Sequence, residues 1–423
     1  MFTPTGGKGK FVVAFNRDRD SYQLPLALHS GARLQALVTD FYAPDHRLGR
    51  LLTPRRLRHR HVHGLPSRLV RSSPRALLLQ VYHEAQRAYG ERWFMQVDAL
   101  LSRKAASIAA ESSADLLLYA QYAQEAFADR RLAKRLKGLF IFHPHTDLAK
   151  QILTRDLEKF PECSGSLKKA VEIDNPELTD RLDAEISMAD FFICASSFTR
   201  RSLVFHGIAP ERVAVVPYGA QPTQAPGTAD RTAARTRFLF VGQGMQRKGL
   251  HHLLRAWKQA RLGNATLRVI CARLDPAFQP LLDQPNVEFS TGVSRAELLE
   301  TFASSHIFVM PSLVEGFGLV YLEALAAGCL VMATPNTGVP DLGLPDEMAL
   351  IVEPGNIDQL CGALQEADRR RKAGAIDHGA ISRRAASLSW EAFRGRILAH
   401  LDDLSAARAS WAQNQPRPAA TQP

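Results

Sequence analysis

The 423-residue sequence has few cysteines, and no two of them are spaced as C-x-x-C. The five cysteines stand at positions 163, 194, 271, 329 and 361. Their odd number and scattered positions argue against a disulfide framework and against a structural zinc site. We therefore expect free thiols in a reducing compartment.

Long apolar runs are also missing. The N-terminal stretch MFTPTGGKGKFVVAFNRD holds an apolar run that is too short for a signal peptide, and no run reaches the length that spans a bilayer. These absences predict a cytoplasmic protein. Peripheral attachment at the inner face of the cytoplasmic membrane stays open as an alternative.

Acidic residues are outnumbered by basic ones. The 42 Asp and Glu against 53 Lys and Arg give a formal net charge of +11 and a pI of about 9.6. Such a charge suits an anionic partner, which means nucleic acid, an acidic membrane surface or a phosphate-bearing substrate. The hydrophobic content of 46% indicates a globular chain, and its length is more than one hydrophobic core usually holds.

Short β-branched or aromatic runs alternate with helix-length segments along almost the whole chain. This alternation is typical of α/β folds with parallel sheets. The longest helical segment is expected around 74–110. Strands are expected at 10–15, 33–41, 115–120, 138–143, 190–196, 212–217, 237–244, 267–272, 286–292, 306–312, 329–335 and 349–353.

A loss of periodicity divides the chain. Residues 220–236, AQPTQAPGTADRTAART, are rich in Ala, Thr and Pro and are predicted to be an interdomain linker. The predicted domains are therefore 1–219 and 237–387, each doubly wound. A C-terminal helix is expected at 388–405, followed by a disordered tail at 406–423.

Two glutamates flank a glycine turn in PSLVEGFGLVYLEALAAG, residues 311–328. Gly316 and Gly318 permit a tight turn and close backbone approach to a ligand, and a helix that begins near Gly318 offers free N–H groups to an anion. Glu323, little more than one turn into this helix, could accept two hydrogen bonds from a vicinal diol such as ribose, and Glu315 could accept from a second sugar. The alternative is that Glu315 caps the helix and Glu323 is solvated.

A second glycine-bearing stretch, FLFVGQGMQRKGL, also follows an expected strand and precedes a helix. It is neither a phosphate-binding Walker loop nor a dinucleotide fingerprint, because Gly242 and Gly244 are not followed by the required residues. It delivers Arg247 and Lys248 to a helix start, where a planar guanidinium and a compact ammonium suit phosphate oxygens. The alternative is a solvated basic pair.

Two further sets of residues have the types that bind metals. His143, His145 and Asp147 follow another expected strand in FHPHTDLAK. Asp18 and Asp20 form an Asp-x-Asp sequence after the first strand. We expect neither to bind a metal, because cationic side chains already suit the role that a metal would fill and because a short Asp-x-Asp match arises readily by chance.

These stretches together resemble the retaining glycosyltransferases of the GT-B fold, family 4 (glycosyl transferases group 1). The family's pair of glutamates within P-S-x-x-E-G-F-G-L-x-x-L-E-A-x-A-x-G is present in full, and segments 184–220, 286–309 and 388–401 are similar to other parts of the family. The resemblance covers roughly residues 110–401. It implies an α/β architecture of two doubly wound Rossmann-like domains facing a central cleft, with the C-terminal helix returning to the N-domain.

The resemblance also implies a site. Domain 1–219 would lie on the acceptor side and domain 237–387 would bind the nucleotide sugar. Glu323 would hold the ribose, Glu315 the hydroxyls of the donor sugar, and one of the two histidines would border that sugar as a positioning group. The catalytic candidates are Glu315, Arg247, Lys248, His143 and His145. The donor-binding candidates are Glu323, Gly316, Phe317, Gly318, Leu319, Gly242, Gly244, Gly292 and Val293.

The implied activity is that of a retaining, metal-independent hexosyltransferase without a cofactor. It would move a sugar from a nucleotide-diphosphate donor to a glycan or lipid-linked acceptor in bacterial envelope polysaccharide synthesis, for lipopolysaccharide or exopolysaccharide. Two alternatives stay open. One is an epimerase or phosphorylase with the same fold, and the other is a non-catalytic module that binds sugar nucleotides.

The chain departs from the family pattern in its N-terminal half. NRDRDSYQ, residues 16–23, stands where relatives have two glycines after the first strand. The segment 46–75 is rich in Arg and Leu, and no Asp or Glu occurs between Asp45 and Glu84. It would suit an anionic membrane surface or a phosphate-bearing lipid-linked acceptor, or it is a solvated loop. Nucleic acid is not expected, since the segment lacks aromatic residues for base stacking.

Overall fold

The computed structural model describes residues 9–45, 49, 51, 53–85, 91–168, 170, 175–220, 231 and 234–414. Most of the predicted linker, and residues 415–423 of the predicted tail, lie outside these residues.

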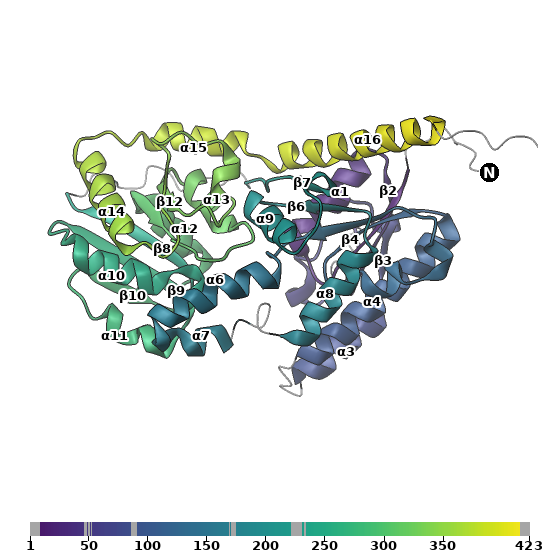
Figure 1. Cartoon of the computed structure of the whole chain (residues 1–423), viewed down its shortest axis with the longest axis horizontal. Coiled ribbons are helices and arrows are strands. Elements are labelled where there is room, and N and C mark those ends of the chain that lie inside the picture. Colours follow the sequence, from purple (N-terminus) through teal and green to yellow (C-terminus); the bar gives the residue numbers. More distant parts are fainter. Residues whose placement is uncertain are drawn as a thin grey trace, which may run out of the picture. The chain divides into compact units, whose positions relative to one another are not determined.

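The described strands of the N-terminal half form a seven-stranded sheet of order β3-β2-β1-β4-β5-β6-β7 (Figure 1). Neighbouring strands run parallel wherever their register is defined, as between β1 and β2 or β1 and β4. The strands are β1 (Phe11–Ala14), β2 (Leu34–Thr39), β3 (Val70–Ser72), β4 (Asp115–Tyr119), β5 (Lys137–Ile141), β6 (Phe191–Cys194) and β7 (Val213–Val215). All six strands that the sequence predicts here are present, whereas β3 was missed because it is short and lies in the arginine-rich segment.

The described strands of the C-terminal half form a six-stranded sheet of order β10-β9-β8-β11-β12-β13, and each pairing is parallel. The strands are β8 (Thr236–Gly244), β9 (Ala265–Leu274), β10 (Val287–Ser290), β11 (Ile307–Val309), β12 (Leu330–Ala333) and β13 (Ala349–Ile351). All six predicted strands are confirmed. Strands such as β12 are apolar at every position because both faces of a parallel sheet are covered by helices.

Helices connect the strands in both halves. They are α1 (Gln23–Ser30), α3 (Pro74–Ala85), α4 (Glu91–Ser112), α5 (Gln124–Phe127), α6 (Thr146–Lys159), α7 (Ser164–Lys168), α8 (Pro176–Met188), α9 (Ser197–Phe205), α10 (Leu250–Ala260), α11 (Gln279–Leu282), α12 (Arg295–Ser304), α13 (Leu319–Ala326), α14 (Ile357–Lys372), α15 (His378–Ser387) and α16 (Trp390–Asn414). The long helical segment expected around 74–110 is thus two helices. Among the described helices, none combines the length and the apolar character needed to cross a membrane.

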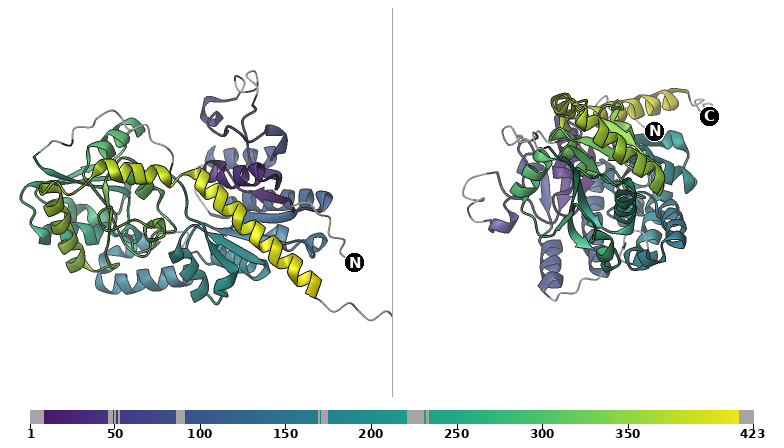
Figure 2. Two further views of the ribbon diagram at one scale, coloured as in Figure 1. Left: turned by 90° about the horizontal axis from the view of Figure 1, so that it is seen from above. Right: turned by 90° about the vertical axis from the view of Figure 1, so that its left-hand side faces the viewer.

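The final helix, α16, is longer than the sequence suggested. It continues through residues 406–414, which were predicted to belong to a disordered tail (Figure 2). The prediction was wrong there because SAARASWAQN contains good helix formers and neither Gly nor Pro. Near its start, Leu398 lies against Gly31, and the Arg394 guanidinium donates to the Gln23 side chain over 2.7 Å.

Contacts divide the described chain into two compact units. One holds the described residues of Met1–Phe140, Arg181–Phe192 and Arg394–Pro423, and the other holds Ile141–Asp180 and Ile193–Phe393. The second unit therefore contains α6, α7 and α9 together with the six-stranded sheet. The domain boundaries inferred from the sequence remain a prediction.

The arginine-rich segment is partly structural. Arg60 is buried and forms an ion pair with the fully buried Asp40 side chain. Arg58 donates to the Thr53 carbonyl oxygen over 2.9 Å. Arg60 is therefore not available to an external anion, and Arg47 and Arg50 lie outside the described residues. The cations that stay exposed in the described part of the segment include Arg55, Arg56, Arg58 and Arg71.

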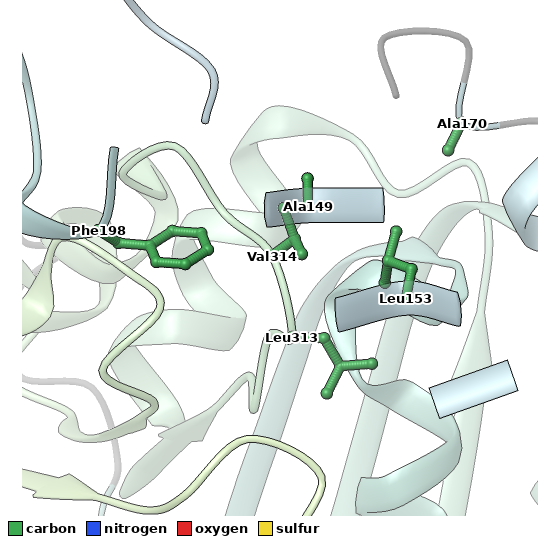
Figure 3. Close-up of a cluster of buried hydrophobic side chains, with 6 residues drawn as sticks. All are labelled: Ala149, Leu153, Ala170, Phe198, Leu313 and Val314. Carbon is green, nitrogen blue, oxygen red and sulfur yellow. The ribbon is translucent and has the colours of Figure 1, made fainter. Parts of the chain in front are cut away.

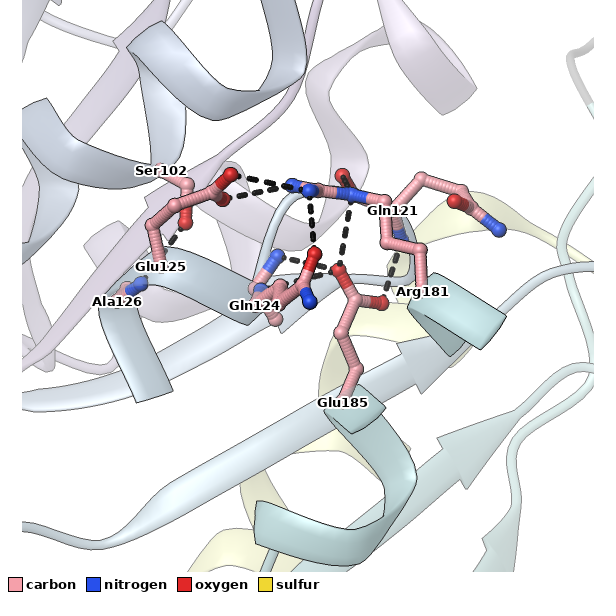
Figure 4. A network of polar contacts seen from close by, with 8 residues as sticks. Ser102, Gln121, Gln124, Glu125, Ala126, Arg181 and Glu185 are labelled. Atoms are coloured by element: carbon pink, nitrogen blue, oxygen red, sulfur yellow. Dashed lines mark hydrogen bonds and ion pairs between the residues drawn. The ribbon is translucent and has the colours of Figure 1, made fainter. Parts of the chain in front are cut away.

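A buried carboxylate fixes the loop after β4 in the first unit. Glu185 of α8 accepts hydrogen bonds from the backbone N–H groups of Gln121, Ala123 and Gln124, at 2.7, 2.8 and 3.1 Å (Figure 4). On the same helix, Arg181 pairs with Glu125 over 2.7 Å. Because these N–H groups have carboxyl oxygens as acceptors, the loop can be buried without leaving these backbone donors unsatisfied.

Replacing this carboxylate should destabilise the fold strongly. We expect Glu185→Ala to lower the free energy of unfolding by about 3 kcal/mol or more, since it leaves three backbone N–H donors of the loop without their acceptor. Asp180→Ala, at an exposed position of the same helix, should change it by less than about 1 kcal/mol. Urea denaturation of both variants checks this, and equal stability of the two would contradict the role of Glu185.

Candidate functional site

The two glycine-bearing stretches of the C-terminal half meet at one edge of the six-stranded sheet. Strands β8 and β11 are neighbours in the sheet. From β8 the chain continues to β9 towards one edge of the sheet, whereas from β11 it continues to β12 towards the opposite edge. The strand order therefore reverses between β8 and β11. In open parallel sheets, the crevice outside the carboxyl ends of strands at such a reversal is where ligands bind.

The turn after β8 carries the two predicted cations. A 3-10 helix, Gln246–Lys248, follows the strand, and Gly249 then takes a left-handed φ of 69° at the start of α10. The carbonyl oxygen of Arg247 accepts the N–H groups of Leu313 and Val314, at 2.8 and 3.2 Å. We call Gln246–Gly249 the cation turn. Its backbone is bonded directly to the loop that precedes Glu315.

Glu315 lies between the two cations. Lys248 Nζ donates to Glu315 Oε2, and Arg247 Nη1 is 3.9 Å from the same oxygen. Glu315 is 8% exposed. Burial raises the pKa of Glu315, but the charges of Lys248 and Arg247 outweigh burial, so this pKa lies below its usual value. The carboxyl group is therefore ionised at neutral pH, and the three residues form one charged cluster.

The glycine turn after Glu315 is required by close packing. A Cβ atom on Gly316 would lie 2.2 Å from the Phe142 carbonyl oxygen, and the carbonyl of Gly316 accepts the hydroxyls of Ser196 and Thr199. Gly318 takes a φ of 86° and is the N-cap residue of α13. The turn therefore holds the start of α13 in a fixed position.

Phe317 and Leu319 differ in exposure. The Phe317 ring is buried against Gly338, and a Cβ atom on Gly338 would lie 2.1 Å from this ring. The centroids of the Phe317 and Tyr218 rings are 5.3 Å apart. Leu319, the first residue of α13, is 41% exposed. The Phe317 side chain thus anchors the turn, and a ligand would meet only its backbone N–H group.

Glu323 lies one turn into α13 and contacts α12. Its Oε1 is 2.7 Å from Arg295 Nη2, and both side chains are partly exposed. Gly292, with a φ of 67° and open space around it, and the half-buried Val293 lie just before α12. The residues predicted for the ribose and the nucleobase therefore belong to segments joined by Arg295. Arg295 stands only two positions after Val293, but no motif in the sequence indicates that it contacts Glu323.

Gly242 and Gly244 lie at the end of β8. A Cβ on Gly244 would be 2.6 Å from Leu274 and 3.2 Å from Cys271, so packing within the sheet layer requires this glycine. A Cβ on Gly242 would make only ordinary contacts, the nearest with Met310 at 3.5 Å. Packing alone therefore explains why residue 244 is a glycine. At residue 242, packing would also allow a side chain.

The two predicted histidines are placed differently. His143 is exposed, and its charge contributes to the lowered pKa of Glu315. His145 is fully buried. Its ring Nδ1 accepts the backbone N–H of Asp147 at the start of α6, and its backbone N–H donates to the Ser202 hydroxyl over 2.7 Å. His145 therefore caps a helix, and His143 is the member of the pair that acts electrostatically on the cluster.

Two groups of described residues have the ligand types and spacing of a metal site. One is His145, Asp147 and His206, and the other is Asp156, Cys163 and His251. In the first group the His145 Nδ1 lone pair already accepts a backbone N–H, and Asp147 is hydrogen-bonded to His206 over 2.7 Å. Hydrogen bonding therefore accounts for this group. Neither group includes the Asp-x-Asp sequence.

The cysteines are placed as the sequence predicts. All five are free and buried, which confirms the expectation of free thiols. Burial raises the pKa of Cys194 and of Cys271 to about 12, so both thiols are protonated at neutral pH.

The N-terminal sheet has its own reversal of strand order, between β1 and β4. After β1 the chain places Arg17, Asp20, Ser21 and Tyr22 at φ values of 65°, 46°, 49° and 62°. Non-glycine residues rarely adopt this conformation, and such strain tends to occur at functional sites. The segment NRDRDSYQ thus adopts the backbone that the family's glycines would permit, while presenting charged side chains.

The cation turn should be intolerant of any side chain at Gly249. A Cβ there would lie 2.0 Å from the Pro311 carbonyl oxygen, and the residue also has a left-handed φ. We expect Gly249→Ala to lower the free energy of unfolding by about 2 kcal/mol or more. Gly263→Ala is the matched control, because nothing lies near its Cβ position and its φ is ordinary. Thermal unfolding that is equally affected by both substitutions would contradict the packing described here.

Comparison with known proteins identifies the C-terminal half. Residues 235–367 match the family model described as Glycosyl transferases group 1. The MMP alpha-(1->4)-mannosyltransferase of Mycolicibacterium hassiacum is 27% identical over 45% of this chain and 48% of its own length. The GDP-mannose-dependent monoacylated alpha-(1-6)-phosphatidylinositol monomannoside mannosyltransferase of Corynebacterium glutamicum is 32% identical over 36% of this chain and 43% of its own length. The chain thus spans less than half the length of these two relatives.

Solved structures share the fold along nearly the whole chain. The sucrose-phosphate synthase of Thermosynechococcus elongatus superposes with a TM-score of 0.60 and 18% identity, covering 94% of this chain and 100% of the other. The HepE protein of Anabaena in complex with UDP superposes with a TM-score of 0.58 and 16% identity, covering 93% and 100%. The predicted α/β architecture with two Rossmann-like sheets is confirmed. The described chain thus has the GT-B fold of these structures, and its residues 235–367 are similar to the glycosyl transferases group 1.

Proposed function

We propose that this chain is a retaining glycosyltransferase that moves a sugar from a nucleotide-diphosphate donor to a glycan or lipid-linked acceptor. The observation that carries the proposal is the cluster of Arg247, Lys248 and Glu315 beside the start of α13. Two cations and a helix N-terminus at the carboxyl ends of adjacent strands form a site for a diphosphate. The names of the relatives, among them a GDP-mannose-dependent transferase, agree with such a donor.

The chemistry follows from where charge develops. Breaking the bond between sugar and phosphate leaves negative charge on the β-phosphate, and fixed cations stabilise this charge most in the transition state. A unit charge about 4 Å from an opposite charge gains about 4 kcal/mol at an effective dielectric near 20. Arg247, Lys248 and the N–H groups at the turn would supply this stabilisation. The departing phosphate is the proposed base for the acceptor hydroxyl, so no catalytic dyad, metal or cofactor is needed.

The two ion pairs suggest how the donor is held. Lys248 forms an ion pair with Glu315, and Arg295 forms one with Glu323. A bound donor would offer phosphate oxygens to Lys248, a sugar hydroxyl to Glu315 and the ribose diol to Glu323, so that each charged group exchanges one partner for another. Gly292 and Val293 would lie against the nucleobase, and His143 would border the sugar.

The acceptor is proposed from the N-terminal sheet. The strained segment after β1 lies at the reversal of strand order and would face the acceptor. A lipopolysaccharide outer core galactosyltransferase, WaaB, is among the proteins with this fold (TM-score 0.56, 14% identity, covering 92% of this chain and 99% of WaaB). We place the reaction in envelope polysaccharide synthesis, in the cytoplasm, with the exposed arginines of segment 46–75 as a contact to an anionic membrane surface.

Donor binding should be visible as a gain in stability. We expect one class among UDP-, GDP- and ADP-sugars to raise the unfolding temperature, with a stabilisation of about 2.7 kcal/mol when the ligand is at 100 times its Kd. A thermal-shift screen followed by calorimetry measures this. A transferase should also release nucleotide diphosphate only when an acceptor is added. Release without any acceptor would favour another reaction, and the absence of binding to all three classes would contradict the proposal.

Substitutions in the cluster should separate the roles of its members. We expect Lys248→Met to weaken binding of both the nucleotide sugar and the free nucleotide diphosphate about tenfold or more, since it removes a charge-assisted contact to phosphate. Glu315→Gln should weaken only the nucleotide sugar, because the free diphosphate has no donor-sugar hydroxyls. Lys258→Met, exposed on α10, is the control and should leave both affinities unchanged. Calorimetry with both ligands checks the pattern, and equal effects of the two substitutions on both ligands would refute the assigned roles.

A further inference from the structure

Asp156 of α6 is a buried carboxylate that receives three nitrogen donors. Its Oδ1 lies 2.7 Å from His252 Nε2, and its Oδ2 lies 3.0 Å from His251 Nε2 and 2.8 Å from Gln246 Nε2. All four side chains are buried. A carboxylate only accepts hydrogen bonds, so both imidazoles must donate from Nε2. The arrangement fixes the orientation of both rings.

The three hydrogen-bond donors to Asp156 stand on both sides of Arg247 and Lys248 in the sequence. Gln246 opens the cation turn immediately before Arg247 and Lys248, and His251 and His252 lie in the first turn of α10 immediately after it. One carboxylate on α6 therefore holds the chain at both ends of the cation turn. The backbone between these two attachments carries Arg247 and Lys248.

The same helix also supports the other half of the cluster. Ala149 and Leu153 of α6 pack in one apolar group with Leu313 and Val314, the two residues before Glu315 (Figure 3). The Gln246 amide also donates to the Leu153 carbonyl oxygen over 2.9 Å. Helix α6 thus contacts the cation turn through Asp156 and the Glu315 loop through its apolar face.

A metal is the competing explanation, since Asp156, Cys163 and His251 place ligand atoms within 4.8 Å of one another. Zinc bonds of about 2.0–2.2 Å in a tetrahedron would separate two nitrogen or oxygen ligands by roughly 3.3 Å. The 2.7 and 3.0 Å between Asp156 and the histidines are direct hydrogen-bond lengths. Gln246, which is a poor zinc ligand, donates to the same carboxylate. The geometry therefore favours a hydrogen-bonded network.

We propose that Asp156 is a positioning residue that holds Arg247 and Lys248 where the leaving diphosphate needs them, by fixing Gln246, His251 and His252 on either side. This inference rests on the proposed function for its catalytic consequence. The predicted structural change does not rest on that function. Loss of the Asp156 charge should move the cation turn relative to Glu315 whether or not the chain transfers sugars.

The test compares Asp156→Asn with Phe302→Ala. Asp156→Asn keeps the side-chain size but removes the charge and turns an NH₂ group towards imidazole donors. Phe302→Ala empties a core position of α12 in the same compact unit and serves as the control for lost stability alone. We expect Asp156→Asn to lower kcat about tenfold or more with its natural acceptor extract, while Phe302→Ala stays within about twofold below its unfolding temperature. Equal kinetic effects of both would overturn the proposal.

A double substitution shows whether Asp156 acts through the cations. If it does, adding Asp156→Asn to Lys248→Met should cost little beyond the loss from Lys248→Met alone, because contacting residues are not additive. Full additivity of the two losses would contradict the proposal. Gln246→Leu provides an independent variant if Asp156→Asn fails to fold. We expect it to lower kcat as well.

A spectroscopic measurement separates this inference from the proposed function. Carboxyl-detected NMR titration of Glu315 reports how close Lys248 and Arg247 are, because their charges lower its pKa. We expect this pKa to rise in Asp156→Asn and to stay unchanged in Phe302→Ala, even if no donor ever binds. An unchanged pKa in Asp156→Asn, or one bound zinc per chain by elemental analysis, would overturn the inference while leaving the proposed function intact.

Discussion

The buried Glu315 carboxylate can stay ionised only because two cations lie against it. Taking a carboxylate out of water carries a large desolvation cost, and a single weakly placed cation rarely offsets that cost. Lys248 and Arg247 supply the compensation, so the chain must hold two segments from different strands within contact distance. The backbone bonds from Leu313 and Val314 to Arg247, the close approach of Gly249 to Pro311 and that of Gly316 to Phe142 all serve this constraint.

The same constraint explains why buried polar groups gather around the cation turn. Asp156 accepts hydrogen bonds from Gln246, His251 and His252 beside the turn, and the Gly316 carbonyl accepts from Ser196 and Thr199 at the start of α9. Each of these groups would be costly if left without a partner. A site that binds a dianion needs rigidity, because preorganised cations need no rearrangement as charge develops.

Much of the fold could be predicted from the sequence because its strands are short apolar runs with a strong local signal. Strand β3 escaped because three residues, one of them Arg71, carry too little of that signal, and the end of α16 was misjudged because composition alone did not separate a helical extension from a disordered tail. Within the site, Glu315, Arg247 and Lys248 were predictable because each follows a strand in a recognisable stretch. Asp156 was not, since nothing in TDLAKQILTRDLEK marks one acidic residue of an amphipathic helix as buried.

The sequence by itself determined the α/β class, the positions of the described strands other than β3, and the identity of the two stretches that carry the charges. Only the tertiary structure decided which of those charges meet. The reversal of strand order between β8 and β11 brings residues 247–248 and 315 together across 67 positions of the chain, and packing on α6 selects Asp156 as their support. The physical reason is that a local pattern records how a segment pairs and buries itself, whereas the partner of a buried charge depends on which distant segment fills the space beside it.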